Sequence, residues 1–203
     1  GLLGLSQSDM DKLVADGLSR DSAVWRGATA RFAANLPEKS LRRIGVKFMR
    51  SLPAAGRVTL IEAFIAAGNR NGAPFLRESL KNREDTPALI AAVGGLGDLG
   101  DASDADTLIE LLGHHNEALA DAARMSLIKL RDADTDARIV RALSKRGGGP
   151  EAHVRLLGVA AFRKPHKAAP AALQYLDSVE PAVRTAALTL LTEIADEKQL
   201  TET

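Results

Sequence analysis

The chain has 203 residues, a formal net charge of +1 and no cysteine, and it is 45% hydrophobic and 26% charged. This balance is typical of a globular domain, and the near-zero charge excludes a strong overall attraction to nucleic acid or to acidic membranes. The lack of cysteine excludes disulfides and thiolate metal sites, and no apolar run reaches the roughly 18 residues that a membrane-spanning helix needs.

The predicted elements are all helices, so the expected fold class is all-α. Aromatic residues make up only 3% of the chain, and Ala and Leu are abundant, which favours closely packed helices with small side chains. No run of alternating β-branched residues is bounded by turn residues, as a strand would require. In chain order, the predicted helix pairs are 9–18 with 22–35, 41–49 with 54–67, 74–80 with 86–96, 104–112 with 117–130, 136–146 with 151–162, and 170–176 with a helix from 181 onward.

The last helix shows the helical pattern most clearly. Val183, Ala187, Leu190 and Ile194 fall at i, i+4, i+7 and i+11, which gives one apolar stripe at the helical period. Pro181 suits the first turn of this helix, where a missing N–H has no consequence. We therefore expect the helix to bury one face against its neighbours.

A short motif recurs along the second helix of each pair. Its clearest copy spans residues 182–196, with Arg184 as the marker position. Self-similarity at this period is typical of stacked helical arrays, because one helix pair cannot bury its own apolar face. We predict a single repeat domain over residues 1–203, with units at about 6–37, 38–69, 70–101, 102–132, 133–165 and 166–198. The other markers are Arg155, Ala120, Leu89, Arg57 and Arg26, which gives spacings of 29, 35, 31, 32 and 31 residues.

The motif also sorts the faces of the second helices. The positions three and seven after each marker are mostly small or apolar, including Gly158 and Phe162 in the fifth unit, and are predicted to be buried. The positions one and five after the marker, such as Thr189, are predicted to face solvent. The candidate partner-binding face combines marker and solvent-facing positions: Arg26, Arg31, Arg57, Glu62, Asp121, Arg155 and Thr185.

A candidate basic stripe lies on the first helix of the second unit. Lys39, Arg43, Lys47 and Arg50 are spaced to share one helix face. The stripe has two interpretations, a solvated helix face or a surface that binds phosphates. The near-zero net charge favours the solvated face, and the chain has no interleaved aromatic residues on which single-stranded bases could stack.

Three polar clusters are better explained as turns and helix caps than as metal sites. His114 and His115, with Glu110 nearby, do not have the three or four clear ligands that zinc needs. The acidic run 132–136 begins like a calcium-binding loop but has neither the required Gly nor the required Glu. We predict that Asp134 or Thr135 caps the next helix. The remaining cluster, Asp98, Asp101, Asp104 and Asp106, also suits helix N-termini.

No catalytic signature is present either. The chain has no Gly-x-Ser-x-Gly motif, phosphate-binding loop or dinucleotide fingerprint. A Ser/His/Asp triad is defined by geometry, and nothing in the sequence indicates one. We expect neither enzyme activity nor a metal or cofactor.

The motif resembles the short bacterial form of HEAT repeats, also called lyase-like HEAT repeats. The similarity is best at residues 183–196 and good at 119–132 and 88–101, weak in the first two units, and interrupted at residues 163–165. The resemblance implies a right-handed α-solenoid of six units, with the second helices on its concave side. It is unspecific for function, because the family includes scaffolds, inhibitors, nucleic-acid binders and a few lyases.

The leading functional expectation is therefore a non-catalytic protein-binding scaffold, as a repeat segment of a larger protein. The alternative is nucleic-acid binding along the basic N-terminal helices. No targeting segment is recognised, so a cytoplasmic location is expected. The apolar arc of the last helix, including Leu188 and Leu191, and the N-terminal Leu2, Leu3 and Leu5 predict that the native chain continues or that copies associate end to end.

Overall fold

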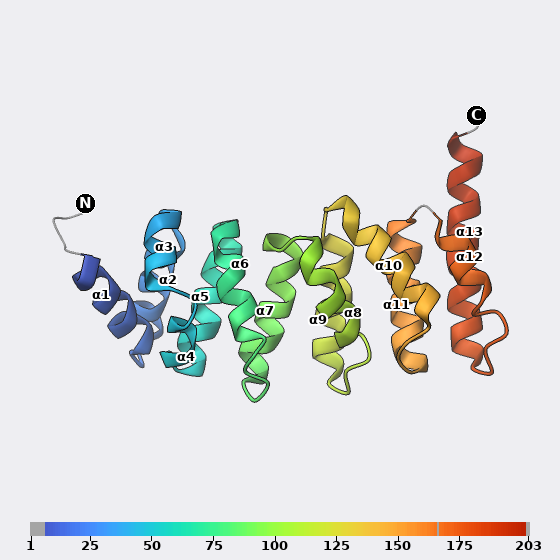
Figure 1. The fold of residues 1–203 in the computed structure, drawn as a ribbon. Coiled ribbons are helices and arrows are strands. Elements are labelled where there is room, and N and C mark those ends of the chain that lie inside the picture. The colour runs from blue at the N-terminus through green and yellow to red at the C-terminus, as the bar shows by residue number, and fades with distance from the viewer. Residues whose placement is uncertain (1–6, 166, 202–203) are drawn as a thin grey trace. The chain divides into compact units, whose positions relative to one another are not determined.

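The structure is a computed structural model that describes residues 7–165 and 167–201 (Figure 1). Every regular element in these ranges is a helix, which confirms the predicted all-α class. The chain divides into two compact units, residues 1–100 and 101–203, and each is described by itself. The predicted Leu2, Leu3 and Leu5 lie outside the described residues.

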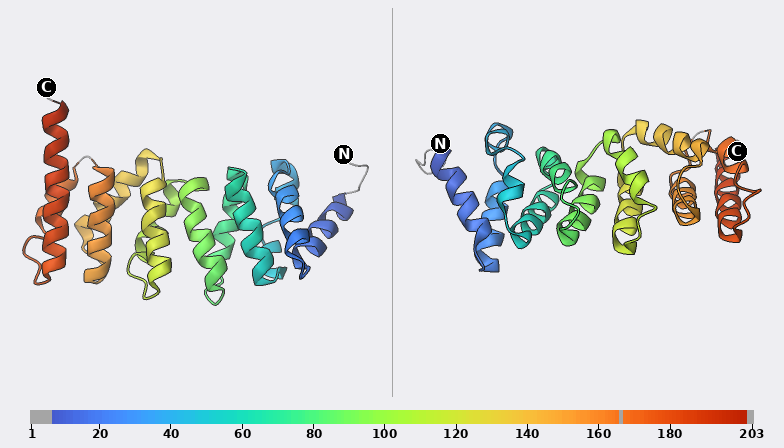
Figure 2. Two further views of the ribbon diagram at one scale, coloured as in Figure 1. Left: turned by 180° about the vertical axis from the view of Figure 1, so that it is seen from behind. Right: turned by 60° about the horizontal axis from the view of Figure 1, so that its bottom comes forward.

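Unit 1, residues 1–100, consists of helices that pack neighbour to neighbour (Figures 1 and 2). α1 contacts α2, α2 contacts α5, α5 contacts α7, and α6 packs on α7. The core contains the fully buried Leu18, Phe64, Leu76 and Leu96. The elements are α1 Gln7–Ser19, α2 Ala23–Ala34, α3 Glu38–Ile44, α4 Phe48–Ser51, α5 Ala54–Ala66, the 3-10 helix η2 Arg70–Gly72, α6 Ala73–Ser79 and α7 Thr86–Leu99.

Unit 2, residues 101–203, follows the same pattern. α8 packs on α9, α9 on α11, and α11 on α13, while α10 contacts α8, α11 and α12. Leu108, Leu127, Leu143 and Leu157 are among its fully buried side chains. The elements are the 3-10 helix η3 Ala102–Asp104, α8 Ala105–Leu111, α9 Glu117–Lys129, α10 Ala133–Lys145, α11 Pro150–Arg163, α12 Ala168–Leu173 and α13 Pro181–Thr201.

The predicted markers occupy equivalent places in five of the six second helices. Arg26, Arg57, Leu89, Ala120 and Arg184 are each the fourth residue of their helix. The positions three after these markers are buried in all five helices. The sequence repeat thus places its marker at the same position in each of these five helices.

The marker predicted for the fifth unit, Arg155, is wrong by two residues. It is the sixth residue of α11, and the fourth is His153. Leu156 and Ala160, three and seven residues after His153, are buried, whereas Gly158 is exposed and Phe162 is 68% exposed. The Val-Arg pair at 154–155 fits the motif by residue type, but the turn before Pro150 sets where α11 begins. With His153 as marker, the spacings of 35 and 29 become 33 and 31.

The single helix predicted over residues 41–49 is also wrong. α3 ends at Ile44, and Gly45 follows with φ of 74°, a left-handed backbone that favours glycine. The Gly45 N–H donates to the Leu41 carbonyl, 3.0 Å away, and closes the helix. The chain resumes as the short α4 at Phe48, so residues 39–50 are divided between two helices.

The cap predicted for α10 is supplied by a different residue. The Asp132 carboxylate accepts from the N–H of Asp134 at 3.0 Å, so neither Asp134 nor Thr135 is the N-cap. The prediction that Asp98, Asp101, Asp104 and Asp106 lie at helix N-termini is confirmed for three of them, because Asp101 and Asp104 form a capping box at η3 and Asp106 lies in the first turn of α8. It is wrong for Asp98, which lies in the last turn of α7. In α13, Leu188 is 55% exposed while Val183 and Leu190 are buried.

Candidate functional site

The marker arginines hold the turns that precede their own helices. Arg26 Nη1 donates to the carbonyls of Arg20 and Asp21 at 2.7 and 2.6 Å. Arg184 Nη1 donates to Ser178 and Val179 at 2.7 and 3.1 Å. These carbonyls lie between the two helices of a pair and have no partner within a helix, so the recurring arginine stabilises the turn.

Two further predicted site residues also donate to turn carbonyls, Arg57 in the turn before its own helix and Arg155 in the turn before α9. Arg57 Nη1 donates to the Leu52 carbonyl at 2.5 Å, and its Nε lies 2.6 Å from the carboxylate of Asp85. Arg155 donates to the Leu112 carbonyl at 2.8 Å and to the Glu117 carboxylate at 2.6 Å. Both side chains are largely buried, so they are built into the fold before any partner binds.

His153 performs the marker's task in the fifth unit. Its Nε2 lies 3.2 Å from the Arg146 carbonyl at the end of α10, the separation of an N–H···O hydrogen bond. The bond bridges the glycine turn between α10 and α11, as the bonds of Arg26 and Arg184 bridge the turns before α2 and α13. This contact supports the corrected register independently of burial.

The other predicted members of the partner-binding face are exposed on second helices. Arg31 lies on α2, Glu62 on α5, Asp121 on α9 and Thr185 on α13. Arg31 and Glu62 make no ion pair with a described residue. Asp121 pairs with Arg124 at 3.5 Å, and the Thr185 hydroxyl donates to its own helix. Solvent exposure at these positions is confirmed.

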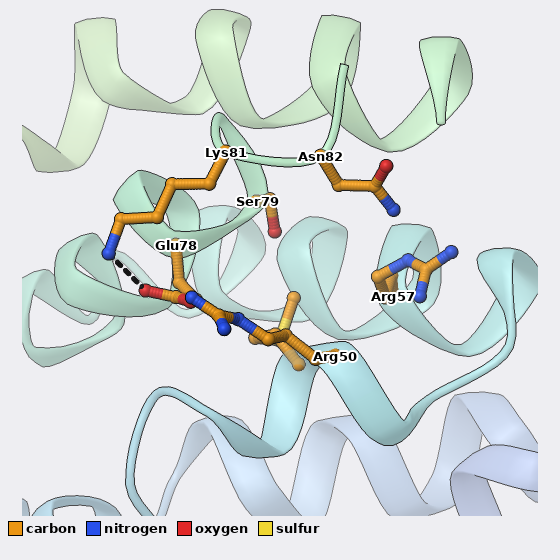
Figure 3. Close-up of a pocket in the computed structure, with 7 residues that line it drawn as sticks. Arg50, Arg57, Glu78, Ser79, Lys81 and Asn82 are labelled. Atoms are coloured by element: carbon orange, nitrogen blue, oxygen red, sulfur yellow. Dashed lines mark hydrogen bonds and ion pairs between the residues drawn. The ribbon is translucent and has the colours of Figure 1, made fainter. Parts of the chain in front are cut away.

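A pocket of about 420 Å³ lies in unit 1, beside α4, α5 and α6 (Figure 3). Glu78 of α6 is the acidic group in its lining, and only 3% of its side chain is exposed. Arg50 Nε donates to one carboxylate oxygen of Glu78 at 2.6 Å, and Lys81 Nζ to the other at 2.7 Å. Arg57 lies across the pocket from this pair, near Asn82 (Figure 3).

The two cations decide the charge state of Glu78. The hydrogen bond from Lys81 lowers the pKa of the carboxyl, burial raises it, and the hydrogen bond and charge of Arg50 lower it again. The net result is a pKa below the ordinary value. Glu78 is therefore ionised at neutral pH and forms an ion pair with each of the two cations.

The predicted basic stripe is not one helix face. Lys39 and Arg43 lie on α3, Lys47 lies in the turn after Gly45, and Arg50 lies on α4. Lys39, Arg43 and Lys47 are exposed, and Arg50 is committed to Glu78. The helical spacing that suggested phosphate binding is interrupted by the break at Gly45.

A larger groove, of about 570 Å³, lies in unit 2. α8 supplies one wall, with Asp106 and Glu110, and α10 supplies the other wall. The glycines 147 and 148 and the first turns of α11 complete the lining. Arg138, Arg141 and Lys145 are the cations of the α10 wall.

The histidine pair lies in a turn and takes part in turn contacts. His114 Nδ1 accepts from the Asn116 N–H at 3.0 Å, and the rings of His114 and His115 are stacked at 4.3 Å. Within residues 7–165 and 167–201, no group of three or more His, Asp or Glu side chains is placed to hold a metal ion. No helix in the same ranges is long and apolar enough to cross a membrane.

Two important residues were missed by the sequence reasoning, Glu78 and Arg163. Arg163 Nη1 donates to the carbonyls of Leu127, Ile128 and Leu130 at 2.9, 3.3 and 2.5 Å, and its Nε donates to Asp136 at 2.6 Å. The available signal was spacing, because Arg50–Glu78 and Arg57–Asp85 are both 28 residues apart.

No family model and no curated protein matches the chain. Among solved structures, the chain is similar to the crystal structure of an engineered protein. The identity is 18%, the alignment covers 93% of this chain and 97% of the other, and the TM-score is 0.44. This similarity is too low to support an argument about function.

Proposed function

We propose that the chain is a non-catalytic, HEAT-like protein-binding scaffold, in which helix pairs stack as a right-handed solenoid and the second helices present the binding face. One observation carries the proposal: Arg31 and Glu62, each five residues after its marker in the successive second helices α2 and α5, are exposed and charged, while the positions three after the markers are buried. A repeated exposed face is the usual working surface of helical arrays.

The marker residues are assigned a supporting part in this proposal. Arg26, Arg57 and Arg184 fix the turns, and a fixed turn sets the direction of the second helix. The exposed residues one and five positions after a marker are then held in place before a partner arrives, which lowers the entropy cost of binding. We therefore assign partner contact to Arg31, Glu62, Asp121 and Thr185.

The experiment is a pull-down from the native organism with the chain as bait, followed by measurement of the recovered partner's affinity. Arg31→Glu combined with Glu62→Arg should weaken that binding about tenfold or more, because both charges are reversed on the proposed face. Lys39→Glu combined with Glu84→Arg is the matched control. It also reverses one cation and one anion, but these exposed residues lie off the second helices.

An equal loss of partner affinity in both double variants would contradict the assignment of the binding face to the second helices. Turnover of a small molecule by the chain, with no partner recovered, would contradict the scaffold itself. Nucleic-acid binding is not proposed, because the helical stripe from which it was inferred is divided at Gly45.

A further inference from the structure

The groove in unit 2 has an apolar floor between two charged walls. Ile109 of α8, Ala142 of α10 and Leu156 of α11 contribute apolar surface to it. Its volume of about 570 Å³ lies within the range of pockets that enclose small ligands or single side chains. A floor of this kind favours an aliphatic side chain over water.

The charges of the two walls are not fully paired with each other. Arg138 of α10 donates to Asp106 of α8, so these two lining charges are paired with each other. Arg141, Lys145 and Glu110 are exposed and make no side-chain hydrogen bond or ion pair with any residue in the described ranges. Two free cations thus face one free carboxylate.

The free cations form a row. Arg141 and Lys145 are four residues apart on α10, so they lie one above the other on the same helix face. A partner that carries two carboxylates could contact both without reorganising the helix. The excess of cations over anions in the open part of the groove selects against a basic partner.

We propose that this groove binds an acidic segment of a partner protein, in which an aliphatic side chain enters between α8 and α10 and flanking carboxylates pair with Arg141 and Lys145. The inference rests on the proposed scaffold function and adds the chemistry of one partner contact. The segment lies along α10, because Glu110 on the opposite wall repels the flanking carboxylates toward Arg141 and Lys145.

The test is fluorescence polarisation with the whole chain and a labelled, capped peptide of sequence Gly-Glu-Leu-Glu-Gly. Two comparison peptides replace both Glu residues by Lys, or the Leu by Gly. The acidic Leu peptide should bind more tightly than either, and its affinity should fall as salt rises, because exposed ion pairs are screened. Arg141→Glu combined with Lys145→Glu should weaken binding about tenfold or more.

The control for charge is Lys39→Glu combined with Arg43→Glu. It removes the same net charge from exposed cations of α3 and should leave peptide affinity within about twofold. The control for shape is a pair of glycine substitutions. Gly147→Phe should block the groove, since Gly147 lines it and has open space at its Cβ position, whereas Gly158→Phe adds the same ring to the exposed side of α11 and should not.

Three results would overturn the inference: equal affinity for the Lys peptide, no effect of the Arg141 and Lys145 reversal, or tighter binding of duplex DNA that depends on the same two residues. These results leave the scaffold function standing if the pull-down still recovers a partner whose binding depends on Arg31 and Glu62. Failure of both experiments would mean that the scaffold proposal is wrong as well.

Discussion

At the scale of single residues, the buried carboxylate of Glu78 is paired with two cations, one near it in the sequence and one 28 residues away. Glu78 is almost fully buried, and its two oxygens are shared between Arg50 and Lys81. A buried carboxylate is costly unless it is paired and hydrogen-bonded. Glu78 therefore contributes to stability only while it stays ionised.

Glu78→Gln should destabilise the chain by about 1–3 kcal/mol at pH 7, because both cations then face a neutral amide. The pKa of Glu78 is lowered in the folded state, so its contribution is present above the ordinary pKa and is lost as the pH falls through the folded one. In urea denaturation, the difference in free energy of unfolding between variant and wild type should therefore shrink below about pH 4.5. The control is Glu62→Gln, at an exposed residue that makes no ion pair within residues 7–165 and 167–201. A difference between Glu78→Gln and wild type that persists at low pH would argue against this account.

Arg163 terminates α9 from a distance in the sequence. Its guanidinium donates hydrogen bonds to three carbonyls at the end of that helix, where main-chain acceptors otherwise have no partner. Arg163→Lys should cost about 2–3 kcal/mol, because an ammonium group cannot reproduce the planar fork of donors. Arg141→Lys, at an exposed position with no side-chain partner among the described residues, should change the free energy of unfolding by less than about 0.5 kcal/mol. If thermal or urea unfolding shows a similar loss of stability for Arg163→Lys and Arg141→Lys, this role for Arg163 is contradicted.

At the scale of elements, close helix contacts depend on particular small residues. A Cβ added to Gly56 of α5 would lie 2.4 Å from the Leu18 carbonyl oxygen of α1, a backbone atom that cannot move aside on its own. Gly158 of α11 is also inside a helix, but a Cβ there would meet nothing within 4 Å. The two glycines are thus both helical, Gly56 in the first turn of α5 and Gly158 in the middle of α11, but only Gly56 is tightly packed.

Gly56→Ala should destabilise the chain by about 1–3 kcal/mol through overpacking. Gly158→Ala should stabilise it by about 0.5–1 kcal/mol, because alanine favours the helix and has room. Thermal unfolding of both variants measures the difference, and two shifts of the same sign would show that the α1–α5 contact is looser than described.

At the scale of the whole molecule, each of the two compact units has its own core. Phe64 is fully buried in unit 1 and contacts Phe75, with ring centroids 5.3 Å apart. Leu127 and Leu157 are fully buried in unit 2. In repeat arrays each element contacts its neighbours in sequence, so the effect of a defect decreases with distance along the chain.

Phe64→Ala should cost about 3–5 kcal/mol and should lower hydrogen-exchange protection mainly between residues 7 and 100. Amides of α9 and α11 should keep most of their protection. Hydrogen exchange read by mass spectrometry resolves the two regions, and equal loss over both would mean that the chain unfolds as one cooperative body.

The sequence alone determined the helical class, the approximate positions of five of the six helix pairs and the helix positions of five of the six markers. These properties follow from apolar spacing and from capping residues, which act over one or two turns of helix. The outward positions Arg31, Glu62, Asp121 and Thr185 were likewise predictable, because a helix face is a local property.

Only the tertiary structure decided the register of the fifth unit, the break at Gly45 and the partners of the charged side chains. The Val-Arg pair at 154–155 matched the motif, yet burial and the His153 contact place the marker two residues earlier. The pairing of Glu78 with Arg50, 28 residues away, and of Arg163 with the end of α9 depends on how helices stack. A motif shows which residue types recur along the chain. It does not show which carbonyl or carboxylate a guanidinium binds, because helix packing determines that partner.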